Sequence, residues 1–290
     1  MDQPQPQAFV IGSSQARSLA ADSNLTLLQL LPTLVKPAQA LARPPISNFH
    51  VGAVGLGSSG RVFIGVNLEF PGLPLHHSVH AEQFLITNLA IHSEPALQAL
   101  AVSAAPCGHC RQFLQEIRNA PDLQILITDE DRIFKSLSTL LPDRFGPFDL
   151  LDTARVPLLL EPNHNRLKLP TGNGGDRQNL ILEALDAANR SHAPYSKCPS
   201  GVALVDDEGR VYKGSYKESA AYNPSLGPVQ AAVIAYVAGG GGGYERIVGG
   251  VLVEMEGAQV KQEATARMIL HLISPQCEFL VVHCSKQFVN

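Results

Sequence analysis

The 290-residue sequence contains no tryptophan, few charged residues and no long apolar run. Its 22 Lys+Arg against 26 Asp+Glu give a formal net charge of -4, which argues against a protein built to bind a phosphate backbone. No apolar segment approaches the roughly 18 residues that cross a bilayer, and the N-terminus lacks the basic start of a secretory signal. We therefore expect a cytosolic protein with no nucleic-acid partner and no membrane contact.

Cysteine is also scarce, with five residues, and only Cys107 and Cys110 are close together. An odd and dispersed set does not form a disulfide framework, so it indicates metal ligands or free thiols in a reducing compartment. Cys277 and Cys284 lie on or beside an expected strand, and we interpret them as buried thiols.

The length of 290 residues favours two domains, and the 45% of hydrophobic residues is enough to form a buried core. Residues 25–41 are rich in leucine and alanine but contain Pro32 and Pro37, which predicts a broken helix. The composition divides the chain into four expected segments: a flexible, polar N-terminus at 1–24, a first domain at 25–150, a linker rich in Pro, Asn and Gly at 151–178, and a second domain at 179–290.

Both domains show strand-like and helix-like segments in one order, which is hairpin, helix, strand, helix, strand. Strands that alternate with helices predict a sheet with helices packed on its faces, an α/β domain. The expected segments are a hairpin at 51–70, a helix at 80–92, a strand at 99–104, a helix at 110–117 and a strand at 123–128, then a hairpin at 201–216, a helix at 229–238, a strand at 247–254, a helix at 265–273 and a strand at 278–284.

The two domains also share residues at a constant offset. The run PISNF at 45–49 aligns with PYSKC at 194–198, and Glu69 aligns with Glu218, each 149 positions further on. A repeat of this length with one element order indicates an internal duplication.

His80, Cys107 and Cys110 are candidate metal ligands. One imidazole and two thiolates suit Zn²⁺, and three protein ligands leave a fourth position open, as in catalytic sites. The cysteines follow Pro106 at an expected helix start, where unpaired N–H groups favour thiolates. A structural zinc site would need a fourth ligand, and His109 is the alternative candidate for it. Its place between the two cysteines favours a side chain that turns away from the metal.

Glu82 is the candidate acid and base. It lies two residues after His80, so on a helix its side chain points roughly 200° away from that ligand. It can still reach water in the open position and move protons. His-x-Glu followed by Pro-Cys-x-x-Cys is the signature by which zinc nucleobase deaminases are identified, with the glutamate as proton carrier. The alternatives are coincidence or a purely structural zinc clip.

Beyond these motifs, the chain resembles the zinc-dependent cytidine deaminases of the two-domain dimeric type, above all those of plants. The resemblance implies a duplicated three-layer α/β/α domain with a mixed sheet between helices, a homodimer, and one Zn²⁺ per chain in the N-terminal domain only. It rests on SNFHVGA at 47–53, GVNLEF at 65–70, HAEQF at 80–84, PCGHCRQF at 106–113 and FGP at 145–147.

The same resemblance implies substrate-binding roles. Phe49 would pack against the pyrimidine, Asn67 and Glu69 would bind the ribose, and Ala81 would line the substrate site. An Asn and a Glu two positions apart on a strand share one face, and their oxygens suit ribose hydroxyls. A negative charge beside the sugar also favours a free pyrimidine nucleoside over a nucleotide. The alternatives are an exposed strand end for Asn67 and Glu69, and ordinary core for Phe49.

The second domain has lost these residues. Aligning its first helix with that of the first domain places Pro228 at the position of the histidine ligand and Gln230 at that of the acid and base, and no Cys-x-x-Cys follows. Cys198 replaces the pocket phenylalanine, and Tyr216 replaces the asparagine. We expect a catalytically silent copy with a packing role.

In the related dimers, segments of neighbouring domains close each pocket, and Phe145 and Ala221, the latter in the loop at 219–226, are the candidates here.

The sequence thus predicts hydrolytic deamination of cytidine and deoxycytidine to uridine and deoxyuridine plus ammonia, in pyrimidine nucleoside salvage or catabolism. Zinc-activated water would attack C4 of the base while Glu82 carries protons. One alternative is a polynucleotide cytosine deaminase, for which the chain lacks basic clusters and tryptophan platforms. The other is a catalytically idle zinc-binding scaffold.

Overall fold

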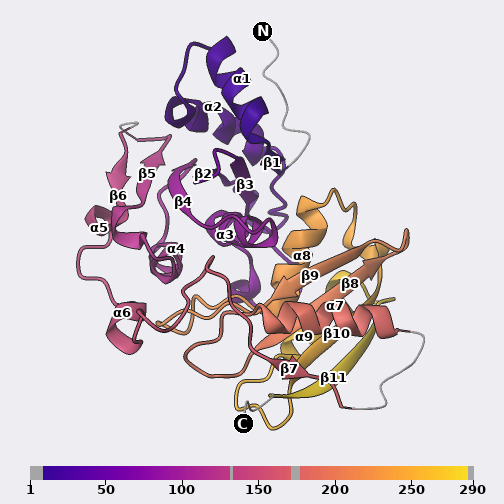
Figure 1. Cartoon of the computed structure of the whole chain (residues 1–290). Coiled ribbons are helices and arrows are strands. Elements are labelled where there is room, and N and C mark those ends of the chain that lie inside the picture. Colours follow the sequence, from indigo (N-terminus) through magenta and orange to yellow (C-terminus); the bar gives the residue numbers. More distant parts are fainter. Residues whose placement is uncertain (1–8, 131–132, 171–176, 287–290) are drawn as a thin grey trace. The chain divides into compact units, whose positions relative to one another are not determined.

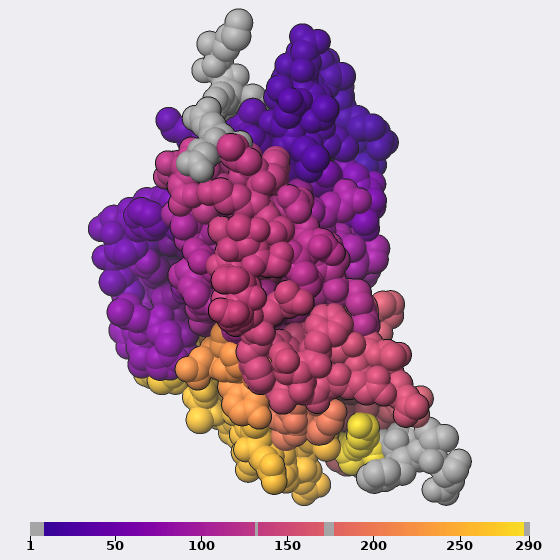
Figure 2. Space-filling view, turned by 90° about the vertical axis from the view of Figure 1, so that its left-hand side faces the viewer, coloured from indigo at the N-terminus to yellow at the C-terminus, as the bar shows by residue number. Residues whose placement is uncertain are grey.

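The computed structural model describes residues 9–130, 133–170 and 177–286, and the chain divides into two compact units (Figure 1). The first unit comprises the described residues up to Thr153 together with Leu158–Glu161 and Ser219–Pro224, and the second comprises the others. Figure 2 shows one face of the chain in space-filling form, with most of the first unit coloured indigo to magenta. The Gly-rich stretch 171–175 of the expected linker lies outside the described residues.

The first unit is built on a six-stranded mixed sheet in the order β1-β3-β2-β4-β5-β6. Its neighbours are antiparallel except β4 and β5, which run parallel. The longer elements are α1 (Ser13–Asp22), α2 (Leu27–Gln39), β2 (Gly52–Gly57), β3 (Val62–Val66), α3 (Ala81–Ile91), β4 (Leu97–Val102), α4 (Gly108–Phe113) and β5 (Gln124–Ile127), and the short ones are β1 (Val10–Ile11), β6 (Lys135–Ser136), α5 (Leu137–Leu140) and α6 (Pro147–Leu150).

Two glycines show why helices can cover both faces of this sheet closely. A Cβ on Gly52 would lie 2.7 Å from the Val35 oxygen of α2, and a Cβ on Gly65 would lie 2.2 Å from the Ala81 oxygen of α3. Gly65 pairs with the residue after Gly52, so the two glycines face opposite sides of the sheet. The sheet therefore lies between α2 and α3, and the expected three-layer α/β/α fold is confirmed (Figure 1).

The second unit repeats this arrangement on a five-stranded sheet in the order β7-β11-β10-β8-β9, in which β10 and β11 run parallel. Gly201 packs against α7 and Gly214 against α8, each 149 positions after its counterpart in the first unit. The duplication expected from the residue offset is thus visible in the packing. The elements are β7 (Leu167–Lys168), α7 (Gln178–Asn189), β8 (Ser200–Asp206), β9 (Val211–Ser215), α8 (Pro228–Ala238), β10 (Ile247–Met255), α9 (Glu263–Ile273) and β11 (Glu278–Lys286).

Two expectations for the N-terminal part are wrong. Within the segment 1–24, residues 13–22 form α1, because Ala16 and Ala20 lie one turn apart and are buried. The predicted break at Pro32 and Pro37 does not occur, since α2 is one helix that contains both prolines. A capping box at its start and a buried apolar face outweigh the hydrogen bonds that the prolines remove.

The expected linker is anchored rather than free. Leu158 and Leu159 are buried in the first unit, where Leu159 N donates to Glu116 O at 2.9 Å. Leu167 pairs with Lys286 at the edge of the second sheet. Apolar side chains within a Pro- and Asn-rich stretch account for this anchoring.

All five cysteines are free, as expected, and Cys284 is buried, whereas Cys277 is half-buried. Burial raises the pKa of both thiols to about 11. Among the described residues, no helix combines the length and the apolar character that crossing a membrane requires.

Candidate metal and active site

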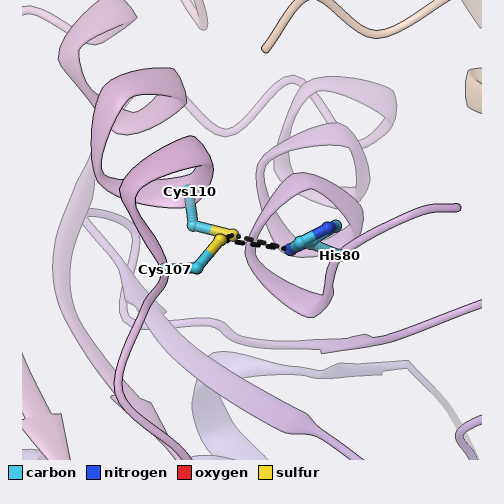
Figure 3. A group of neighbouring side chains, drawn as sticks. All are labelled: His80, Cys107 and Cys110. Carbon is cyan, nitrogen blue, oxygen red and sulfur yellow. Dashed lines mark hydrogen bonds between the residues drawn. The ribbon is translucent and has the colours of Figure 1, made fainter. Parts of the chain in front are cut away.

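His80, Cys107 and Cys110 meet at the starts of two helices of the first unit (Figure 3). His80 is the residue before α3, Cys107 is the residue before α4, and Cys110 lies in the first turn of α4. The three side chains point toward one another. The expected ligand set is therefore assembled from segments 27 or more residues apart in the sequence.

The donor atoms are spaced as a tetrahedral zinc ion requires. His80 Nδ1 lies 3.5 Å from Cys107 Sγ and 3.2 Å from Cys110 Sγ, and the two sulfurs lie 3.7 Å apart. Zn–S bonds near 2.3 Å and Zn–N bonds near 2.1 Å, at tetrahedral angles, separate such donors by about 3.6–3.8 Å. The three separations lie within about 0.4 Å of these values, so the donor set fits zinc.

The charges of the two cysteines are coupled. Hydrogen bonds with Cys110 and His80 lower the pKa of Cys107 to about 3. The contact with Cys107, together with burial and the nearby Glu82 carboxylate, raises the pKa of Cys110. The pair thus holds one negative charge readily and a second only beside a cation, which is the behaviour of a metal site.

Glu82 lies beside these donors, in the first turn of α3. Its side chain is buried, and Oε2 lies 3.2 Å from Cys110 Sγ. Burial raises the pKa of Glu82, so the carboxyl keeps a proton closer to neutral pH than an exposed glutamate does. A group of this kind can take up and return a proton at the metal position.

His109 stands outside the group of candidate ligands. Its ring stacks on that of His80, with centroids 4.9 Å apart and planes 24° from parallel. The structure therefore makes His109 a neighbour of a ligand, and the four-ligand alternative has no support.

Asn67 and Glu69 hold the loop that carries Phe49. The amide of Asn67 accepts a hydrogen bond from Val51 N and donates one to Phe49 O, each at 2.9 Å. Glu69 Oε2 accepts from the N–H groups of Ile46 and Ser47, both at 2.9 Å. The Phe49 ring is 60% exposed, so the alternative of ordinary core is wrong for it.

Chain segment Ser219–Pro224 belongs to the first unit and contains the expected closure residue Ala221. Its two ends are held by buried side chains that the sequence analysis did not single out. Gln83 Nε2 donates to Pro224 O at 2.9 Å, and Glu116 Oε1 accepts from Ala220 N at 2.7 Å. Gln83 follows Glu82 directly, and its place three residues after His80 is the sequence signal for a residue that caps the helix.

The second closure candidate, Phe145, follows α5 and is 45% exposed. Gln112 Nε2 donates to Phe145 O at 2.6 Å, and Arg111 donates to Pro106 O and to Leu140 O at 2.7 and 2.8 Å. Both side chains of α4 thus hold backbone segments beside the cysteine loop.

The alignment of the second unit on the first differs from the one expected from sequence. Ala81 O and Leu85 N face Gly65 in the first unit, whereas Pro228 O and Ala232 N face the equivalent glycine in the second. The helices α3 and α8 therefore align at an offset of 147 (228 − 81 and 232 − 85). The connection between strand and helix is two residues shorter in the second unit, a change that the local sequence match hid.

Gly227 therefore occupies the position of the histidine ligand, and Val229 occupies that of Glu82. Placing Pro228 and Gln230 at these positions was wrong by one residue. Neither Gly nor Val can bind a metal through its side chain or move a proton, and the catalytically silent second copy stays a prediction.

Comparisons with known proteins agree with this site. A family described as "Cytidine and deoxycytidylate deaminase zinc-binding region" matches residues 26–126, and a second profile of the same description matches residues 137–267. Cytidine deaminase 1 of Arabidopsis thaliana is 60% identical over 98% of this chain and 99% of its own length. Cytidine deaminase 6 of that plant is 55% identical over 90% and 93%.

Among solved structures, a cytidine deaminase from Mycobacterium tuberculosis aligns at 34% identity with 40% of this chain and 95% of its own, with a TM-score of 0.37. The plant relatives match nearly the full length of both chains, and one family description covers both halves of this one. The chain belongs to the cytidine deaminase family.

Proposed function

We propose that the protein catalyses zinc-dependent hydrolytic deamination of cytidine and deoxycytidine to uridine and deoxyuridine with release of ammonia. The observation that carries this proposal is the buried carboxylate of Glu82, 3.2 Å from one sulfur of a His-Cys-Cys donor set. Three donors leave one tetrahedral position for the reaction, and the carboxylate stands next to it.

Zinc, when bound, supplies the Lewis acidity that makes water nucleophilic at neutral pH. Glu82 takes the first proton of the attacking water on a carboxylate oxygen and gives it to the ring nitrogen as the C4–O bond forms. It then takes the second proton, from the new hydroxyl on C4, and gives it to the amine, so that the C4–N bond breaks and ammonia leaves. Burial raises the pKa of Glu82, and this suits both directions, because such a carboxyl holds a proton more readily than an exposed glutamate and can still give it up.

The substrate pocket is proposed to combine Phe49 against the pyrimidine, Asn67 and Glu69 at the ribose, and Ala81 beside the base. Support comes from the loop that these residues already share, since Asn67 and Glu69 fix the backbone on either side of Phe49. Phe145 and Ala221 are proposed to close the pocket against water. Both lie in segments held by buried or helix-borne side chains of the first unit.

The catalytic zinc ion is proposed to number one per chain and to bind in the N-terminal domain only. The second domain matches the same family description, but Gly227 and Val229 stand at the ligand and acid/base positions. The proposed domains are a catalytic one at 25–150 and a non-catalytic one at 179–290. A homodimer in the cytosol, acting in pyrimidine nucleoside salvage, completes the proposal.

The first test is a substrate comparison on purified protein. Ammonia release from cytidine and deoxycytidine should exceed release from CMP, adenosine and single-stranded RNA by orders of magnitude. Turnover of single-stranded RNA or DNA comparable to that of cytidine would instead identify a polynucleotide deaminase.

The second test separates an enzyme from an idle scaffold. This matters because a relative of 43% identity is named "Probable inactive cytidine deaminase 4". Glu82→Gln should keep one zinc per chain and the native circular dichroism spectrum. Ammonia release should fall at least a thousandfold, because a single general acid or base contributes roughly 10²–10⁴-fold and Glu82 serves as both. Glu94→Gln, which removes another buried glutamate of the same unit, should leave kcat unchanged in the folded protein. An unchanged rate in Glu82→Gln would remove Glu82 from its role.

A further inference from the structure

A second group of potential metal ligands lies in the second unit, in the domain without a catalytic site. Glu254, Glu263 and His283 each offer one donor atom, and these atoms lie within 4.8 Å of one another. Glu254 is on β10 and His283 on β11, and the two residues are direct partners in the parallel register. Glu263 is the first residue of α9. Three elements thus meet at one point.

Glu254 is the unusual member of this group. Its side chain is 1% exposed, and its Oε1 atom has no hydrogen-bond partner. The other oxygen, Oε2, accepts a hydrogen bond from Gln262 N at 2.8 Å. A buried carboxylate oxygen without a partner is costly and rare in folded proteins, unless a cation or a proton satisfies it.

The unsatisfied oxygen faces the imidazole of His283. Glu254 Oε1 lies 3.9 Å from His283 Nε2, too far for a hydrogen bond and about 0.5 Å wider than two nitrogen or oxygen donors of one tetrahedral zinc ion, so the imidazole moves closer when both bind an ion. One oxygen of Glu263 accepts from Arg267 Nε at 2.8 Å, which leaves its other oxygen for a ligand. The side chains of Glu263 and His283 are 38% and 48% exposed, so both can adjust their rotamers and an ion can enter from solvent.

The position in the fold is that of a ligand site. Glu254 and His283 lie near the carboxyl ends of the two parallel strands of their sheet. In the first unit, the parallel strands β4 and β5 end at the same edge, and the chain leaving β4 carries Cys107 five residues after Val102. Binding sites of layered α/β sheets occur at this edge.

We propose that Glu254, Glu263 and His283 form a second divalent-cation site, which binds Zn²⁺ and clamps β10, β11 and the start of α9 together. Two carboxylates and one imidazole are donors that zinc accepts at about 2.0–2.2 Å, with water completing the set. The site is separate from the catalytic one and takes no part in proton transfer. Its expected effect is on the stability of the second unit, because an ion that binds only the folded state stabilises it.

The test uses the full-length protein with its catalytic zinc in place. Isothermal titration with Zn²⁺, followed by metal counting by mass spectrometry, should show one further equivalent, raising the ratio from one to two ions per chain. Co²⁺ used as a probe should occupy this site without the thiolate charge-transfer absorption that a two-cysteine site gives. Zn²⁺ should also raise the melting temperature above that of the protein with one ion.

Two variants and one control decide the assignment. Glu254→Gln and His283→Ala should each abolish the second equivalent and the thermal shift. Glu256→Gln removes the same charge from an exposed residue two positions away and should keep both. His283 is half exposed, so its replacement tests the site even where the change at buried Glu254 disturbs folding. A ratio that stays at one ion per chain in the wild type, or a second equivalent that survives His283→Ala, overturns the proposal.

Discussion

At the scale of single residues, two glutamates in equivalent positions make the same bonds in the two units. Glu69 accepts hydrogen bonds from Ile46 N, Ser47 N and Ser47 Oγ, and Glu218 accepts from the counterparts of these three groups. The bonds recur in a unit that has Gly227 and Val229 at the positions of His80 and Glu82, so we assign them to the architecture of the fold. Binding of ribose would be an added task of Glu69 alone.

This difference gives a paired prediction. Glu69→Gln and Glu218→Gln should each lower the free energy of unfolding by about 1–2 kcal/mol, because both weaken a charged hydrogen-bond set. Only Glu69→Gln should also raise the KM for cytidine. The increase should be roughly tenfold, which corresponds to the loss of one charged hydrogen bond to the ribose. Steady-state kinetics and urea unfolding of both variants measure the two effects. Equal KM values in the two variants would restrict Glu69 to its structural role.

The stability contribution of Glu69 has a pH dependence of defined sign. Burial acts to raise the pKa of Glu69, but the bonds from Ser47 and Ile46 outweigh it and leave the pKa below its ordinary value. A group with a lowered pKa in the folded state stabilises the fold above its unfolded pKa, and this stability is lost as the pH falls through the folded pKa. The stability difference between wild type and Glu69→Gln should therefore shrink below about pH 4.

The sequence predicted that His80, Cys107, Cys110 and Glu82 lie together, because short motifs carry them: His-x-Glu brings two of the residues and Pro-Cys-x-x-Cys the other two. It did not predict Glu116, whose contact with Ala220 spans 104 positions of sequence. Nor did it locate Gly227 and Val229, because the shorter connection before α8 has no local signal.

At the scale of elements, close packing of helices on strands depends on glycines rather than on apolar bulk. The hairpins and α3 were predicted near their observed bounds, since their patterns are local. The continuity of α2 was not, because it depends on Leu30, Leu31 and Leu34 being buried against the rest of the unit. Tertiary packing of this kind overrides the helix-breaking tendency of proline.

A prediction at this scale concerns Gly201. A Cβ there would lie 2.2 Å from Ala188 N and 2.6 Å from Ala184 O of α7, so Gly201→Ala forces strand and helix apart. We expect a loss of about 2–3 kcal/mol, within the range of overpacked cores. Gly52→Ala should act in the same way on α2, while Gly12→Ala, with no atom within 4 Å of the added Cβ, should change stability little. Thermal unfolding of the three variants checks this, and an unchanged melting temperature for Gly201→Ala would contradict it.

At the scale of the whole molecule, a single copy of the chain has several large apolar side chains of the first unit exposed to solvent. Phe49, Phe145, Phe148 and Leu150 are between 45% and 60% exposed. A pyrimidine held against Phe49 must be shielded from bulk water if Glu82 is to exchange protons with the substrate alone. The segment Ser219–Pro224 is the proposed source of part of the cover, and a second copy of the chain is the proposed source of the remainder.

The resulting prediction is a homodimer on which activity depends. Sedimentation equilibrium should give twice the chain mass of 31.1 kDa, and activity per chain should fall on dilution as dimers dissociate. Phe148→Ser, on α6, should weaken the dimer and lower activity at nanomolar concentration while leaving the zinc content unchanged. Leu182→Ser is the matched control, because this leucine of α7 is 47% exposed, close to the 52% of Phe148. A single-chain mass at micromolar concentration with full activity would show that one chain closes its own pocket, and the exposed phenylalanines would then need another explanation.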